Sequence, residues 1–182
     1  MTGLKAFKKN SVLGLALAGA VALSFQMSQP ARAETTQATL LDRVQIEDLM
    51  IDYYWDLTSQ GRHDINKYWA KDAVFNVNGE VIKGRDAIQK VYNTRTNDRI
   101  APSGKFNMLL NNPRISVNGN KAVMDAVWTG VMSDTKRATP RFIEQGTEHT
   151  EFVKENGHWL IISRTLVSDG GMPDAYDGNQ KD

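Results

Sequence analysis

Residues 141–168 read RFIEQGTEHTEFVKE-NG-HWLIISRTLVS: two strand-like stretches joined by Asn156-Gly157. Asn-Gly between two such stretches is the strongest short signal for a β-hairpin, because a type I′ turn needs positive φ at both central residues. The same dipeptide occurs at Asn78-Gly79 and Asn118-Gly119, each between apolar stretches. The second half of the chain is therefore predicted to form an antiparallel sheet.

Outward from this hairpin, the pattern predicts strands over 105–118, 121–133, 141–155 and 158–168, and a short hairpin around Asn78-Gly79. Before them, apolar residues recur at helical spacing from Thr39 to Ser59, and Gly61 follows as a stop. Two shorter helices are expected over 64–70 and from Arg85 to about Thr94. The sequence thus predicts an α+β fold with three N-terminal helices packed on a mostly antiparallel sheet.

The N-terminal 33 residues have the layout of a secretory signal peptide. A basic head containing Lys5, Lys8 and Lys9 precedes an apolar run over 11–25, and Ala31-Arg32-Ala33 ends the segment. The run is shorter than the roughly 20 residues that cross a bilayer. We therefore expect a periplasmic or secreted protein without a membrane anchor, with one domain over 34–182 whose last residues, 169–182, form a flexible tail.

Charge and composition argue against nucleic-acid, metal and cofactor binding. The chain has 22 basic and 21 acidic residues, and four basic but no acidic residues precede Glu34, which leaves a net charge of −3 after cleavage. A mildly acidic chain without a cluster of basic residues is not expected to bind nucleic acid. Its three histidines lack metal-ligand spacing, no Gly-rich phosphate loop is present, and cysteine is absent, so neither cofactor nor metal is expected.

Several motifs, taken together, resemble one superfamily. They are Asp42-Arg43…Ile46…Leu49…Tyr53-Tyr54, Trp69–Phe75, Gly84–Ile88 and Gly157–Ile161. Over Leu40 to about Val167 the chain resembles nuclear-transport-factor-2-like (NTF2-like) proteins, particularly the SnoaL-like branch, whose relatives include ketosteroid isomerases, scytalone dehydratase and polyketide cyclases. The resemblance implies a cone-shaped fold, a pocket on the concave sheet face for a small molecule, and a homodimer.

The catalytic residues of known relatives match this chain unevenly. Tyr54 matches the catalytic tyrosine of ketosteroid isomerase. Val77 and His149 fall where that enzyme carries its two aspartates, and a valine can abstract no proton. The resemblance therefore does not imply ketosteroid isomerase activity.

Strand pairing suggests which residues share the pocket. A two-residue Asn156-Gly157 turn places His149 opposite Arg164, on one face with Gln145 and Glu151. A guanidinium this close keeps an imidazole neutral, and a neutral imidazole facing a cavity can act as general base. The other interpretation is structural: His149 and Arg164 form an ordinary pair in the sheet without a catalytic role. Glu151 or an anionic ligand would then be the partner of Arg164.

The remaining candidates are polar or aromatic. Tyr54 either donates to a developing oxyanion or packs its helix on the sheet. A two-residue Asn118-Gly119 turn places Asn107 and Asn111 on the Trp128 face as substrate orienters, and Asp125 on the opposite face as a reserve base. An aromatic lining suits a flat substrate and consists of Tyr53, Tyr54, Phe75 and Trp128.

Two functions follow from these candidates. The leading hypothesis is a cofactor-independent lyase or isomerase acting on a small aromatic or carbonyl-containing molecule. His149 would be its base, Tyr54 its oxyanion donor and Arg164 its anion anchor. The alternative is a non-catalytic periplasmic protein that binds a small molecule.

Overall fold

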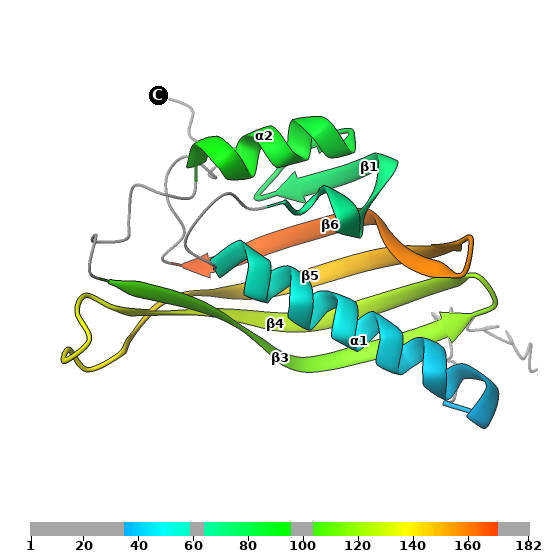
Figure 1. The fold of residues 1–182 in the computed structure, drawn as a ribbon, viewed down its shortest axis with the longest axis horizontal. Helices are drawn as coiled ribbons and strands as arrows, with labels where there is room; N and C mark the ends of the chain where they lie inside the picture. The colour runs from blue at the N-terminus through cyan, green and yellow to red at the C-terminus, as the bar shows by residue number, and fades with distance from the viewer. Residues whose placement is uncertain (1–34, 59–63, 96–103, 171–182) are drawn as a thin grey trace, which may run out of the picture. The chain divides into compact units, whose positions relative to one another are not determined.

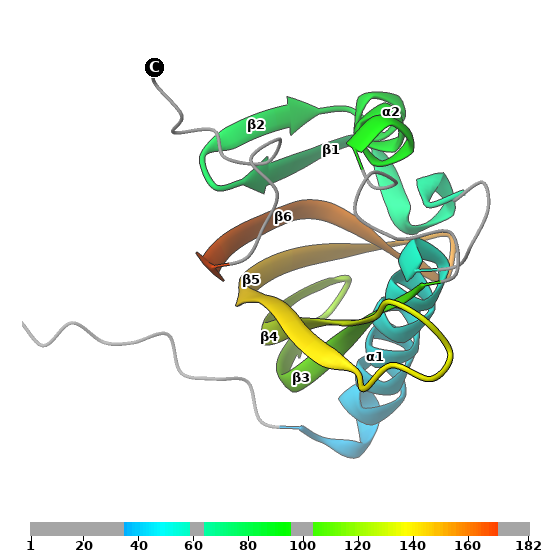
Figure 2. The same ribbon diagram turned by 90° about the vertical axis from the view of Figure 1, so that its left-hand side faces the viewer.

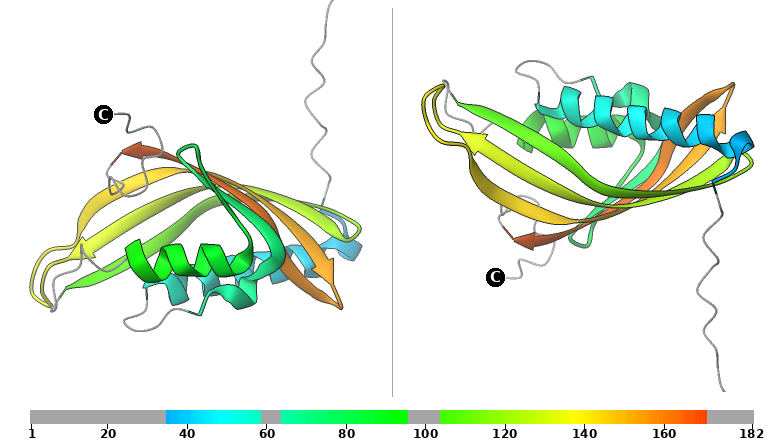
Figure 3. Two further views of the ribbon diagram at one scale, coloured as in Figure 1. Left: turned by 90° about the horizontal axis from the view of Figure 1, so that it is seen from above. Right: turned by 90° about the horizontal axis from the view of Figure 1, so that it is seen from below.

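Six strands form one curved sheet, with helices on one of its faces (Figures 1 and 3). The computed structural model describes residues 35–58, 64–95 and 104–170, all within the unit Arg32–Asp182. The predicted signal peptide and most of the predicted tail lie outside these residues. None of the described helices is both long and apolar enough to cross a membrane.

The helices differ in number from the prediction. The first helix, α1 (Gln37–Thr58), and the last, α2 (Arg85–Arg95), lie where the sequence indicated. The expected helix over 64–70 is a single 3-10 turn, η1 (Asn66–Tyr68), and strand β1 begins directly at Trp69. Among the described residues the fold therefore has two α-helices rather than three. The alternating burial of β1 explains the difference, because Ala73, Phe75 and Val77 all point into the core.

The strands confirm the predicted sheet. They are β1 (Trp69–Val77), β2 (Glu80–Lys83), β3 (Lys105–Asn118), β4 (Lys121–Ser133), β5 (Arg141–Glu155) and β6 (His158–Gly170). Their order in the sheet is β2-β1-β6-β5-β4-β3, and only the β1–β6 pair is parallel. Asn78-Gly79 and Asn156-Gly157 have the positive φ angles that a type I′ turn requires.

Two of the register shifts in the sheet move candidate side chains to faces that the turns alone would not predict. In β6, Ile162 has no partner on β5, so the pairing changes from Phe152 with Ile161 to Glu151 with Ser163. In β3, the shift falls at Asn112-Pro113, where Asn112 takes a positive φ. Each shift is a β-bulge, which reverses the inward and outward positions of the residues beyond it.

The core lies between α1 and the concave face of the sheet (Figures 2 and 3). Ile46, Met50, Tyr53 and Tyr54 occupy one side of α1 and are buried. The sheet contributes buried side chains from all six strands: Phe75, Ile82, Ile115, Met124, Phe152 and Ile161. The two layers enclose the region where the candidate residues of α1, β5 and β6 meet.

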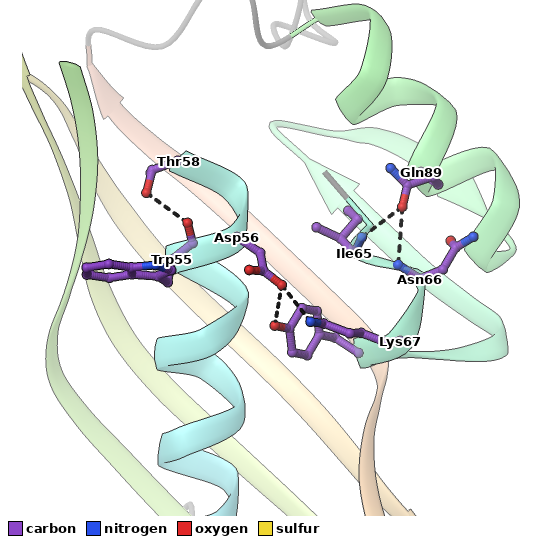
Figure 4. A network of polar contacts seen from close by, with 8 residues as sticks. Trp55, Asp56, Thr58, Ile65, Asn66, Lys67 and Gln89 are labelled. Atoms are coloured by element: carbon purple, nitrogen blue, oxygen red, sulfur yellow. Dashed lines mark hydrogen bonds and ion pairs between the residues drawn. The ribbon is translucent and has the colours of Figure 1, made fainter. Parts of the chain in front are cut away.

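Polar contacts join the helices to η1 (Figure 4). The Asp56 carboxylate of α1 accepts a hydrogen bond from the Tyr68 hydroxyl at 2.7 Å and forms an ion pair with Lys67 at 2.8 Å. From α2, Gln89 Oε1 accepts the backbone N–H groups of Ile65 and Asn66. These contacts tie the last turn of α1 and the middle of α2 to residues 65–68.

Candidate functional site

Three side chains form a buried hydrogen-bonded cluster in the core. Arg164 of β6 and Glu148 of β5 are 1% and 3% exposed, and Tyr54 of α1 is 3% exposed. Arg164 Nε donates to Glu148 Oε2 at 2.7 Å, and Nη2 forms an ion pair with the same oxygen at 2.5 Å. Arg164 Nη2 also donates to the Tyr54 hydroxyl at 2.6 Å, which in turn donates to Glu148 Oε1 at 3.0 Å.

Burial and charge fix the ionisation states of two members of this cluster. Burial raises the pKa of Tyr54 well above its ordinary value, although the Arg164 cation opposes the shift, so Tyr54 is a neutral phenol at pH 7. Burial alone lowers the pKa of Arg164, but the Glu148 carboxylate and the neighbouring tyrosines together raise it well above its ordinary value. Arg164 is therefore a permanent cation held against an acid.

Aromatic rings enclose the guanidinium. Arg164 lies 4.7 Å from the ring centroid of Tyr53 and 5.1 Å from that of Tyr54. The Tyr53 hydroxyl donates to the Tyr92 hydroxyl of α2 at 2.7 Å, and Tyr92 stacks on Phe75. Burial raises the pKa of both Tyr53 and Tyr92, so both stay neutral. The cluster thus combines one ion pair with uncharged rings, as cation–π packing favours.

Some buried polar atoms in this region lack a protein partner. Among the described residues, Arg164 Nη1, Trp128 Nε1, Trp69 Nε1 and Thr150 Oγ1 make no hydrogen bond. Buried donors almost always have an acceptor, and leaving one unmatched costs about 1–3 kcal/mol. Arg164 Nη1 matters most for chemistry, because a hydrogen bond from a charged donor is roughly twice as strong as one from a neutral donor.

The predicted base lies on the other face of the sheet. The pairing arithmetic holds at the turn, where Glu155 faces His158, but beyond the Ile162 bulge His149 faces Thr165. His149 Nδ1 lies 2.7 Å from Asp125 Oδ1, and the two side chains are 50% and 63% exposed. His149 therefore does not face Tyr54 and Arg164, and the predicted His149–Arg164 pair is wrong.

Other predicted pocket residues also occupy the outer face. Glu151 lies beside His149 there, with Glu151 Oε1 3.9 Å from His149 Nε2. Gln145 pairs with Thr129 and donates to Asp169 at 3.3 Å. Both lie on the face opposite Glu148, so the prediction that they share a face with Arg164 is wrong.

The asparagines of β3 are likewise displaced. The hairpin turns at Gly119-Asn120 rather than at Asn118-Gly119, and the bulge at Asn112-Pro113 then shifts the register by one residue. Trp128 therefore pairs with Leu110 and does not share a face with Asn107 and Asn111. Asn111 instead donates to the Thr129 hydroxyl at 2.9 Å, and Asn107 is exposed. Trp128 itself is buried, and Asp125 lies on the opposite face, as predicted.

The outer face holds an open depression of about 580 Å³. Its lining includes Arg114, Asp125, His149 and Val167. The Asp125–His149 pair is thus accessible to solvent, unlike the inner cluster. Within the described residues, no group of three His, Asp or Glu side chains is placed to hold a metal ion.

Glu148 and Tyr92 were missed by the sequence reasoning. A signal for Glu148 was present, since it alternates in step with Gly146, Thr150 and the apolar Phe152, which marks an inward face. Tyr92 gave no signal beyond its place on a helix.

Comparison with known proteins identifies the family. The SnoaL-like domain matches residues 38–165. An NTF2-like protein with a cystatin-like fold from Novosphingobium aromaticivorans is similar at 20% identity, over 76% of this chain and 88% of its own, with a TM-score of 0.63. A proposed scytalone dehydratase from the same organism matches at 20% identity over 75% and 89% of the two chains, with a TM-score of 0.61.

A third similar structure is ActVI-ORFA from Streptomyces coelicolor, at 13% identity over 70% of this chain and 96% of its own, with a TM-score of 0.62. At these identities the structures support the fold alone. No curated protein matches the chain. Because the domain match spans most of the residues that form the helices and the sheet, the chain belongs to the SnoaL-like domain family.

Proposed function

We propose that this protein is a cofactor-independent lyase or isomerase that acts on a small aromatic or carbonyl-containing molecule. The observation that carries the proposal is the buried Tyr54–Glu148–Arg164 cluster with its unmatched donor at Arg164 Nη1. A preorganised donor in a dry site stabilises negative charge that develops on a substrate oxygen.

Glu148 takes the role of base that the sequence analysis gave to His149. Its Oε1 accepts one hydrogen bond from Tyr54, which leaves a second lone pair on that oxygen for a proton. In the proposed step, a proton leaves the carbon next to the substrate carbonyl and binds Glu148 Oε1. The electron pair of that C–H bond forms a double bond to the carbonyl carbon, and the π pair of the carbonyl group moves to its oxygen, where Arg164 Nη1 stabilises the negative charge.

From the enolate two outcomes are open. The proton returns to a different carbon in an isomerase, whereas a leaving group departs in a lyase. The aromatic rings of Tyr53, Phe75 and Trp128 favour a flat substrate, which accords with the small-molecule substrates of the family.

The test is proton exchange, which needs no knowledge of the final product. The purified protein is incubated in D2O with a panel of small aromatic ketones, and NMR follows deuterium uptake at the carbon next to the carbonyl. Glu148→Gln keeps the shape but removes the base, so exchange is expected to fall about 10²–10⁴-fold. His149→Gln, one residue away on the outer face, is the matched control and should retain exchange.

A non-catalytic binding protein is the second candidate. It is favoured by the charge balance of the cluster, because the Glu148 carboxylate is already paired with the Arg164 guanidinium. Tight binding of an aromatic ketone without exchange in any variant supports this alternative. Exchange that survives Glu148→Gln removes Glu148 as the base.

We also propose that the protein is periplasmic or secreted, which the signal-like segment over 1–33 supports. We further propose that it has no membrane attachment once this segment is removed, and that it forms a homodimer. Cell fractionation and N-terminal sequencing test the first two points: the protein should be released with the periplasm or medium and begin at Glu34.

A further inference from the structure

The outward side of α1 is unusually apolar. Among the described residues, five of the ten large apolar side chains that are exposed belong to α1, whereas the other five are spread one to a strand over β2 to β6. The five on α1 are 45–73% exposed: Leu40, Leu41, Val44, Ile51 and Trp55. A surface helix of a monomer normally turns polar residues to this side.

Four of these residues form one stripe. At 3.6 residues per turn, Leu40, Val44, Ile51 and Trp55 fall within an arc of about 60° on the helix, away from the buried side that carries Met50 and Tyr53. Leu41 flanks the arc. Figure 4 shows Trp55 projecting from α1 on the side away from Asp56. We call Leu40, Val44, Ile51 and Trp55 the α1 stripe.

The α1 stripe is symmetric about the middle of its helix. The midpoint of Gln37–Thr58 lies between Glu47 and Asp48. Leu40 and Trp55 are equidistant from that point, and so are Val44 and Ile51. A two-fold axis through the midpoint therefore places Leu40 against Trp55 of an antiparallel copy and Val44 against Ile51. Such self-complementarity is what an isologous dimer interface requires.

The surface is also of the right size. At about 100 Å² for each half-exposed large side chain, the five apolar residues present roughly 500 Å² per protomer. A standard interface buries about 800 Å² per partner, and the polar rim around a helix about 33 Å long supplies the remainder. Strand addition at the neighbouring edge is less suitable, because Pro113 and the bulge at Asn112 interrupt β3.

We propose that two copies of this chain associate by antiparallel packing of α1 on α1 through the α1 stripe. This interface is separate from the buried cluster, so it stands or falls independently of the proposed activity. Glu47 and Asp48 approach their copies at the two-fold axis. Salt screens such repulsion, so added salt tightens the dimer.

Disulfide trapping tests the geometry, since the natural chain has no cysteine. A double variant, Val44→Cys with Ile51→Cys, puts a thiol opposite a thiol of the second copy and should form a covalent dimer on mild oxidation. Within one helix the two positions are about 10.5 Å apart along the axis, too far for a disulfide. Val44→Cys alone is the matched control, because its copies are separated by the same distance.

Light scattering after size exclusion gives the second measurement. The purified protein should be a dimer, and Ile51→Glu should raise its dissociation constant about 100-fold or more, because the symmetry introduces the charge twice. Val167→Glu, on the outer sheet face, should leave the dimer intact. Circular dichroism confirms that each variant is folded. A monomer at all concentrations, or a dimer that Val167→Glu alone disrupts, overturns the proposal.

Discussion

Replacing Arg164 by methionine tests whether the buried ion pair is as tight as its geometry indicates. The guanidinium is 1% exposed and touches Glu148 through two nitrogens and the Tyr54 hydroxyl through one of them. Methionine fills much of the same volume without charge. The change therefore leaves the Glu148 carboxylate buried with Tyr54 as its remaining donor.

The size of the effect follows from the environment. Removing one partner of a buried ion pair costs about 3–5 kcal/mol, because the other charge is left uncompensated. Replacing both partners by apolar residues is often nearly neutral, since neither desolvated charge remains. We therefore expect Arg164→Met to lose about 3–5 kcal/mol of unfolding free energy. The double variant, Arg164→Met with Glu148→Leu, should recover most of that loss.

Urea unfolding followed by tryptophan fluorescence measures these values. His149→Ala on the exposed outer face is the control, with an expected change of about 0.5 kcal/mol or less. If Arg164→Met costs under 1 kcal/mol, the pair is hydrated rather than buried. If the double variant is no more stable than the single one, the loss comes from packing and not from the abandoned charge.

Three shorter predictions concern the same framework. Tyr54→Phe removes one donor and one acceptor from the cluster and should cost about 1–3 kcal/mol in urea unfolding. Gly146→Ala should destabilise the fold by about 1–3 kcal/mol, because its Cβ would clash with the backbone carbonyl of Val167 and lie 2.5 Å from the Trp128 ring; a variant as stable as the natural protein would disprove this close packing. The pKa of Asp42 is lowered chiefly by its hydrogen bond from Lys154, so its stabilising contribution is present above about pH 3.8 and is lost as the pH falls further. Asp42→Asn should therefore weaken the protein at pH 7 but not at pH 2, by thermal unfolding.

The fold was largely predictable because its signals are local. An Asn-Gly dipeptide fixes a tight turn through its own backbone preference, and alternation on either side fixes the strands. The bounds predicted for β3, β4 and β5 agree with the structure. The helix expected over 64–70 failed because its apolar residues fit the start of a strand equally well.

The site was less predictable because it depends on register. Counting from the Asn156-Gly157 turn gives the correct partners only as far as Phe152 and Ile161. A hint of the bulge was present, since the apolar run of Leu160, Ile161 and Ile162 breaks the alternation that a regular strand would show. The contact between Tyr54 and Arg164 could not be derived from the hairpin turns, because it depends on how α1 packs on the sheet.

The bulge at Ile162 accounts for the chemistry of both faces. Without the extra residue, Arg164 would lie on the solvent side near His149 and Asp125, where water would screen its charge. With it, Arg164 turns inward beside Glu148, and the inner face gains an ion pair that only a dry environment makes strong. The outer face keeps the Asp125–His149 pair in solvent. A single inserted residue thus decides that Arg164 joins Glu148 in the core, and for that reason we propose Glu148 rather than His149 as the base.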